Sequence, residues 1–476
     1  MDAGTPASHR TLTHRETLLV VLGVLLPVFM GSLDTTILAS ALPTIGREFG
    51  EVHNLPWLIT AYLIANTSIT ALYGKISDAQ GRRVTLLIAI SLYMLGSLVC
   101  ALAPNMVVLI LGRVLHGLGG GGLTSTGMVV LGDIAAPKDR GKYYGYFSAV
   151  YTTAGALGPA LGGFIAEYLH WSVIFWMNIP LGIIAVATTF TLLRGLPRHD
   201  RPHQLDFLGA GLIMAASSSF MLALSMGGVN YPWLSTPILA LFAAALLLGA
   251  AFIVRLRTAP EPLIPLTILS SREARLAIAA NAFGWGPIVG LHIFLPMYLQ
   301  NIVGLAPASA GLCVLTLAVT LNISAGITGT ILPRRERYKT IPIVGLTLAI
   351  ASALMLAWRA KSMALPEFEG LLFLIGAGFG CMPPLAATAL QNNVSIRTFG
   401  SAVATMQFSR NLFATTLVAV FGAIILSGVS QTGGATAAPY SVESFVHVFL
   451  AVAVSFAVSL ATILMLDEKP LETKHS

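Results

Sequence analysis

Two residues of opposite charge lie inside long apolar runs, and they are the first candidates for chemistry. Asp34 belongs to a run that begins near Thr17, and Arg113 to one that begins near Met106. At about 1.5 Å per residue, Asp34 lies roughly 25 Å from the start of its run and Arg113 roughly 10 Å from the start of its own. If the first and fourth runs cross a membrane in opposite directions, both charges lie in its outer half. An intramembrane carboxylate is costly unless it is paired or protonated, so we predict a pair that protonation of Asp34 would release. The alternative is a structural pair that only holds two helices together.

Three further polar residues stand in apolar surroundings. Arg410 falls about ten residues into its run, near mid-depth, where it could contact substrate or carbonyl groups, or serve structure alone. His116 shares a helical face with Arg113, and His292 lies in a later run. For both histidines a packed neutral ring is favoured over a proton relay, but we keep all three as candidate substrate or cavity residues.

The sequence offers little that an enzyme or a nucleic-acid-binding protein would need. Cys100, Cys313 and Cys381 show no metal-ligand spacing, and there is no nucleophile and base arrangement. No G-x-x-x-x-G-K-[ST] motif occurs, so ATP is not expected to drive the protein. The formal net charge of +7 comes from residues in short loops, which indicates membrane topology and not an RNA-binding surface. We therefore expect no enzyme, no metal, no cofactor and no nucleic-acid partner.

The composition requires a lipid bilayer as partner. Of 476 residues, 55% are hydrophobic and 10% charged, far from the roughly 25% charged residues of soluble domains. Apolar runs long enough to span the bilayer begin at about fourteen places, which are Thr17, Pro56, Val84, Met106, Tyr144, Val173, Phe207, Leu234, Leu276, Ala308, Ile341, Glu369, Gly400 and Ser444. We predict an all-α polytopic membrane protein.

The basic residues set the orientation. With the N-terminus inside, the outer loops hold only Arg47, Arg359 and Lys361, whereas most Lys and Arg residues fall in the inner loops. This asymmetry places both termini in the cytoplasm. Arginine- and proline-rich loops bracket the seventh and eighth spans, so we divide the chain into a six-helix bundle (1–194), a linker with two inserted spans (195–275), and a second six-helix bundle with a cytoplasmic tail (276–476).

The loop after the second span has the spacing G-x-x-x-D-x-x-G-R-R, formed by Gly74, Asp78, Gly81, Arg82 and Arg83. It resembles the loop motif between helices two and three of the major facilitator superfamily, and we interpret it as a gating loop. Glycines permit tight turns, and the aspartate can pair with arginines or cap a helix. Alternatively, the basic residues only enforce topology.

The fifth span carries a G-P-x-x-G-G motif, made by Gly158, Pro159, Gly162 and Gly163. It resembles the helix that marks antiporters of this superfamily, although Ala154 stands where the family usually has glycine. Small residues let helices approach closely in either case. The stretch around Asp34 is similar to the first helix of the drug:proton antiporter branch with about fourteen helices.

This resemblance implies a multidrug-efflux type of transporter that exports small amphipathic or hydrophobic compounds by alternating access. The driving force would be the proton gradient, with Asp34 and Arg113 as coupling residues. Two alternatives stay open, namely uptake by a symporter or facilitator and a non-transporting sensor or scaffold of the same fold. We expect a monomer in the cell (inner) membrane. The sequence leaves the cargo and the role of the inserted pair undetermined.

Overall fold

The computed structural model describes residues 14–50, 54–134, 140–193, 206–228, 231–264, 266–305, 307–332, 338–394, 398–427 and 441–467. These residues are almost entirely helical, and the part of the chain within these ranges contains no β-strand beyond an isolated bridge between Gly227 and Tyr231. The all-α prediction is confirmed. The loops holding Arg194, Arg198, Arg201 and Arg334 to Arg337, and both chain ends, lie outside the described residues.

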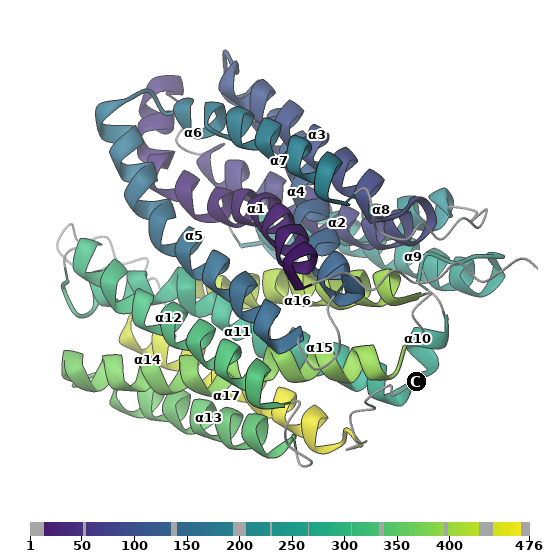
Figure 1. Cartoon of the computed structure of the whole chain (residues 1–476). Coiled ribbons are helices and arrows are strands. Elements are labelled where there is room, and N and C mark those ends of the chain that lie inside the picture. The colour runs from purple at the N-terminus through teal and green to yellow at the C-terminus, as the bar shows by residue number, and fades with distance from the viewer. Residues whose placement is uncertain are drawn as a thin grey trace, which may run out of the picture.

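The first bundle contains the helices α1 to α7 (Figure 1). The final two, α6 and α7, make one span that is interrupted at Met177. The bounds are α1 (His14–Phe49), α2 (Leu55–Gln80), α3 (Arg82–Ala101), α4 (Met106–Ile134), α5 (Arg140–Tyr168), α6 (Val173–Trp176) and α7 (Asn178–Leu192).

The second bundle is built from α11 to α17, below the first in Figure 1. Its α14 and α15 form a single span broken at Cys381, where Pro383 and Pro384 occupy the first turn of α15 and cannot donate backbone hydrogen bonds. The bounds are α11 (Arg272–Asn301), α12 (Pro307–Ile331), α13 (Thr340–Arg359), α14 (Leu365–Gly380), α15 (Met382–Asn392), α16 (Phe399–Ser427) and α17 (Val442–Leu464), and a short α10 (Leu266–Ser270) precedes them.

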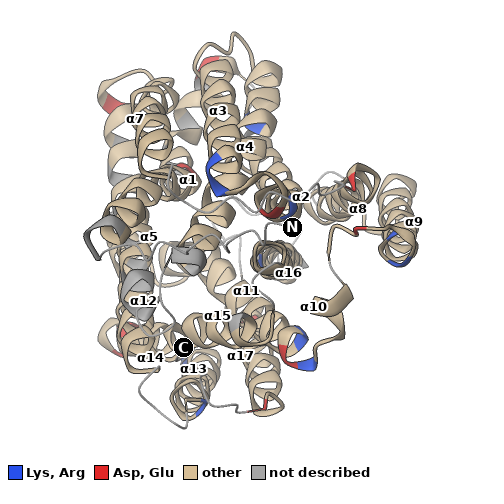
Figure 2. Cartoon of the chain, turned by 45° about the vertical axis from the view of Figure 1, so that its right-hand side comes forward, with Lys and Arg blue, Asp and Glu red and all other residues tan. Residues whose placement is uncertain are grey.

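The inserted pair comprises α8 (Phe207–Met226) and α9 (Thr236–Thr258), which stand beside the bundles next to α2 and α16 (Figure 2). The hydroxyl of Ser68 on α2 lies 3.0 Å from that of Ser218 and 3.1 Å from that of Ser217 on α8. Asp206 caps α8 and pairs with Arg255 of α9 at 2.9 Å. In the most hydrophobic 18-residue stretch of α9 only 11% of the residues are buried, so this helix presents most of its surface to lipid.

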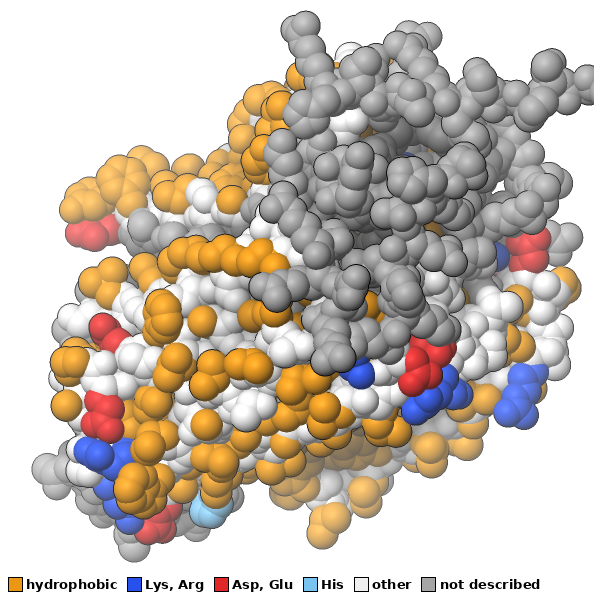
Figure 3. Space-filling view, turned by 60° about the horizontal axis from the view of Figure 1, so that its bottom comes forward, with side chains coloured by type: hydrophobic (Ala, Val, Ile, Leu, Met, Phe, Trp, Pro, Cys, Tyr) orange, Lys and Arg blue, Asp and Glu red, His pale blue; other side chains and the backbone are white. Residues whose placement is uncertain are grey.

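Twelve described helical segments are long and apolar enough to cross a membrane. The helices α2 and α5 also have 26 and 29 residues but are not among the twelve, so the count of fourteen spans stays a prediction. On the face seen in Figure 3, charged side chains gather toward the ends and hydrophobic ones cover the middle. This pattern is that of a multi-pass membrane protein.

The two bundles meet along two pairs of helices. One contact is made by α2 and α16, and the other by α5 and α12 (Figure 1). Apart from His292, and from Gly81 in the turn between α2 and α3, the candidate site residues lie on α1 to α5 or on α16. We call the end of the molecule at this turn the basic end, because Lys75, Arg82 and Arg83 lie there. The distribution of Lys and Arg in the loops predicts that this end faces the cytoplasm.

Candidate functional site

Asp34 of α1 and Arg113 of α4 form a direct ion pair inside the first bundle. The guanidinium Nη1 lies 2.8 Å from both carboxylate oxygens, and the residues are 2% and 1% exposed. Arg113 also donates through Nε to the carbonyl of Leu58 at 2.9 Å and lies over the ring of Tyr62, 4.3 Å from its centroid. The cation therefore has partners on α2 as well as on α1, so neutralising Asp34 would leave it partly held.

His116, on the same helix as Arg113, contacts both members of this pair. Its Nδ1 lies 2.9 Å from Nη1 of Arg113 and 3.6 Å from Asp34. A guanidinium can only donate, so Nδ1 accepts and the ring proton sits on Nε2. That Nε2 is buried and finds no hydrogen-bond partner within the described residues. The geometry corresponds to a neutral ring that packs 3.9 Å from the ring centroid of Tyr93.

The glycines of α5 bring it directly against α1. A Cβ atom at Gly158 would overlap the hydroxyl of Thr36, and one at Gly162 would overlap the carbonyl oxygen of Ile37. These contacts lie two and three residues beyond Asp34 on α1. Pro159 and Gly163 belong to the same helix, but their side-chain environments are outside the description. The motif thus fixes the distance between α5 and the helix that carries the acid.

At the basic end, Asp78 links the two bundles. Its Oδ2 accepts from the backbone N–H of Ser401 at 2.8 Å and from the Ser401 hydroxyl at 2.7 Å, while Oδ1 accepts from Arg82 at 2.8 Å. Ser401 lies in the first turn of α16, where free N–H groups and the helix dipole favour an anion. Asp78 therefore caps a helix of the opposite bundle. Gly74 and Gly400 allow the close approach, since a Cβ at Gly74 would overlap Ala404 and one at Gly400 would overlap Asp78.

The remaining residues of this loop have separate contacts. Gly81 has φ 87° and ψ 159°, a backbone conformation that is essentially restricted to glycine. Arg83 lies over the ring of Phe190, 4.1 Å from its centroid. Lys75 pairs at 3.4 Å with Glu261, which follows α9, so the gating loop is also attached to the inserted segment.

Arg410 lies on α16 far from Asp34 in sequence and has a different environment. Its guanidinium carbon is 4.7 Å from the ring centroid of Trp285 on α11, and Nε donates weakly to Asn411 at 3.4 Å. Tyr151 of α5, in the opposite bundle, interacts with it electrostatically. His292 forms no described contact with this group, and its Nδ1 bonds the carbonyl of Ile288 in its own helix at 2.8 Å.

The comparisons with known proteins decide the family. The sequence pattern of the Major Facilitator Superfamily matches residues 24–416. This chain belongs to the Major Facilitator Superfamily. The Multidrug transporter protein MdtP of Bacillus subtilis (strain 168) is 32% identical over 409 residues, which cover 86% of this chain and 75% of that protein. Multidrug resistance protein 3 of the same organism is 29% identical over 415 residues, covering 87% of this chain and 80% of that protein.

Solved structures agree on the fold. The proton:xylose symporter XylE bound to 6-bromo-6-deoxy-D-glucose has a TM-score of 0.64 and 14% sequence identity, and the match covers 96% of each chain. At that identity the likeness shows the fold alone. The expected major facilitator fold and the resemblance to multidrug-efflux transporters are confirmed, and this superfamily member is a transporter and not an enzyme.

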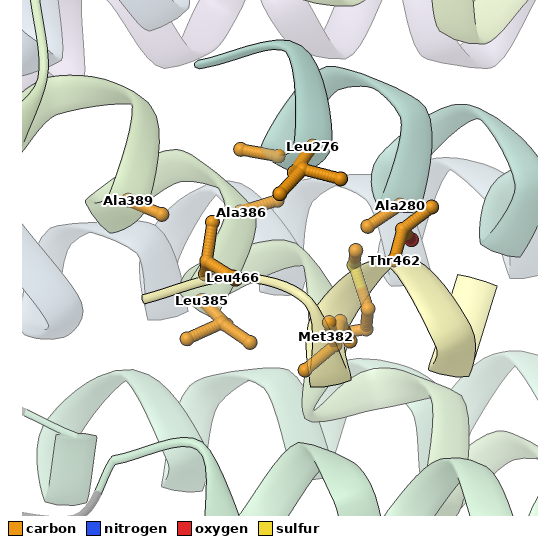
Figure 4. Close-up of a pocket in the computed structure, with 10 residues that line it drawn as sticks. Leu276, Ala280, Met382, Leu385, Ala386, Ala389, Thr462 and Leu466 are labelled. Atoms are coloured by element: carbon orange, nitrogen blue, oxygen red, sulfur yellow. The ribbon is translucent and has the colours of Figure 1, made fainter. Parts of the chain in front are cut away.

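The charged candidate residues of this transporter lie in three separate places. Asp34, Arg113 and His116 form the buried pair, Asp78 and Arg82 form the link at the basic end, and Arg410 stands at the bundle interface. A small pocket in the second bundle (Figure 4) contains none of them. Its lining is apolar except for Thr462, and includes Leu276, Met382 and Leu466.

Several partners of these residues were not singled out from the sequence. No motif marks these partners, which are Ser401, Tyr151, Trp285 and Glu261. Tyr62, whose ring lies against the Arg113 guanidinium, was likewise assigned no role from the sequence. The roles of the predicted site residues stay predictions, because contact alone does not assign a function.

Proposed function

We propose that this chain is a proton-coupled exporter of small amphipathic or hydrophobic compounds that works by alternating access. The observation that carries the proposal is the buried Asp34–Arg113 pair, in which a carboxylate that can bind a proton directly contacts a cation that cannot release one. Relatives named as multidrug transporters support export and a broad substrate range.

Proton binding at Asp34 would remove the negative charge on α1 that attracts Arg113 of α4. The cation would then keep its contacts with the Leu58 carbonyl and the Tyr62 ring on α2 and with His116 on its own helix. Attraction between α1 and α4 would weaken, while attraction between α4 and α2 would persist. Because α1 is packed tightly against α5 through Gly158 and Gly162, both helices would respond together.

The link between Asp78 and α16 would serve as the reversible contact of the cycle. It consists of two hydrogen bonds across the bundles plus the interaction with the helix N-terminus, so it can be broken without unfolding either bundle. In this cycle the basic end opens when α16 leaves Asp78 and closes when it returns. Cytoplasmic termini and residence in the cell (inner) membrane complete the proposal.

The test is pH-gradient-driven movement of a lipophilic fluorescent dye in proteoliposomes, together with dye exchange in the absence of a gradient. We expect Asp34→Asn to lose gradient-driven movement and to retain exchange, because it mimics a permanently neutral site. Asp467→Asn is the matched control, since Asp467 is exposed and its ion pair within the described residues is the surface contact with Arg272. Full gradient-driven transport by Asp34→Asn would refute the coupling role.

A further inference from the structure

Arg410 is a cation without an anion. Among the arginines inside the described bundles and the inserted pair, Arg82, Arg113 and Arg255 each contact a carboxylate at 2.8–2.9 Å. Arg410 forms no ion pair with any described carboxylate; its polar neighbours are Asn411, at 3.4 Å, and the hydroxyl of Tyr151, which interacts with it from the opposite bundle. It lies eleven residues after the start of α16, or roughly 17 Å from the basic end. A charge at that depth is unfavourable unless something pairs with it.

Tyr151 faces Arg410 from the opposite bundle at the same depth. It too lies eleven residues after the start of its helix, α5, at the basic end. Its hydroxyl is buried and finds no hydrogen bond of normal geometry among the described residues. Buried hydroxyl groups are normally satisfied, and this one adjoins an unpaired guanidinium. The guanidinium and the hydroxyl therefore face each other from two bundles, and no described carboxylate neutralises the cation.

Aromatic rings lie on the two helices, α11 and α16, that meet at Arg410. Trp285 stacks on the guanidinium, and the rings of Phe283 and Phe413 lie 4.2 Å apart between α11 and α16. All three rings are only partly buried, as is Arg410 itself. The surroundings therefore combine an accessible cation and a hydroxyl donor with flat apolar surfaces, a combination that suits an acidic group attached to an aromatic body.

We infer that Arg410 and Tyr151 bind the acidic group of an amphipathic organic anion, such as a carboxylate or sulfonate on an aromatic body, while Trp285, Phe283 and Phe413 contact that body. This rests on the proposed transport function only for its biological role, since the binding itself needs no gradient. Organic cations of the same shape are disfavoured, because Arg410 would repel them and no described carboxylate lies beside it.

The test measures equilibrium binding to the purified full-length protein in detergent. Three probes share one body and differ in charge: pyrenebutyrate, pyrenebutanol and pyrenebutyltrimethylammonium. Energy transfer from tryptophan to pyrene reports binding. We expect the anion to bind at least about tenfold more tightly than the alcohol, and the cation most weakly, because a hydrogen-bonded charge pair commonly contributes that much.

The variants separate charge from packing. Arg410→Gln should bring anion binding down to that of the alcohol while alcohol binding persists, which also shows that the variant is folded. Arg410→Lys should keep part of the preference, and Tyr151→Phe should reduce it. Arg257→Gln makes the same change at an exposed position of α9 and should alter nothing.

Binding that ignores probe charge, a preference that survives Arg410→Gln, or no binding of pyrenebutyrate would each overturn the inference. The proposed function fails separately. Loss of gradient-driven dye transport with charge-selective binding intact would reject proton-coupled export alone, whereas working transport with charge-blind binding would reject the anion site alone.

Discussion

The two ends of the buried ion pair should respond unequally to mutation. Asp34→Asn leaves a guanidinium that cannot lose its proton, at a site that is 1% exposed. Removing one partner of a buried pair commonly costs about 3–5 kcal/mol. The contacts of Arg113 with Leu58, Tyr62 and His116 remain, so we expect the lower end, about 3 kcal/mol.

Arg113→Gln should cost less, about 1–2 kcal/mol, because the acid left behind can be neutralised by a proton and only hydrogen bonds are lost. The double variant buries no unpaired charge and should cost little more than Arg113→Gln alone. The two single changes are therefore coupled by at least about 1.5 kcal/mol, well above the roughly 0.5 kcal/mol within which independent sites add.

The assay is equilibrium unfolding of the purified chain in mixed micelles with increasing denaturing detergent, which gives the free energy of unfolding for the wild type, both single variants and the double variant. Asp467→Asn serves as the control and should cost less than about 1 kcal/mol, because it breaks an exposed pair. If the two single costs are equal and simply add, the pair does not act as a unit and our reading of its electrostatics is wrong.

Three further predictions concern close contacts. Gly162→Ala should destabilise the chain by about 1–3 kcal/mol because its Cβ would overlap a backbone carbonyl. Gly155→Ala on the same helix meets nothing within 4 Å and should be neutral in the same unfolding assay. Gly81→Ala should lower the free energy of unfolding by about 1–3 kcal/mol because of the backbone conformation at this position. Gly211→Ala, in open space on α8, should not destabilise the chain. Equal unfolding curves for these two variants would contradict the prediction. Asp78→Asn should weaken the link to α16 and lengthen the distance between spin labels placed on α2 and α16 at the basic end, and an unchanged distance distribution would argue against this link as a gate.

Sequence reasoning predicted those features that depend on single helices. The depth of Asp34 and Arg113 followed from counting residues along two spans, because a helix rises by a fixed amount per residue. The pair itself then followed from the high cost of leaving either charge alone in lipid. The family motifs were readable for the same reason, since each lies within one short segment of the chain.

Features that depend on the packing of distant helices could not be predicted. Asp78 and Ser401 are 323 residues apart. A serine in a span carries no sequence signal that the free N–H groups of its helix will bond a carboxylate from the other bundle. Likewise, Tyr151 and Trp285 meet Arg410 only because α5, α11 and α16 converge. Aromatic residues are common in spans, so neither ring could be distinguished beforehand.

The position of the inserted pair makes the two flanks of the transporter unlike. On one flank α8 packs on both α2 and α16 and so covers the seam between the bundles. On the other flank the seam runs between α5 and α12, and no additional helix lies over it in the described part of the chain. A hydrophobic molecule that diffuses sideways within the bilayer therefore reaches a shielded seam from one direction and a bare seam from the other.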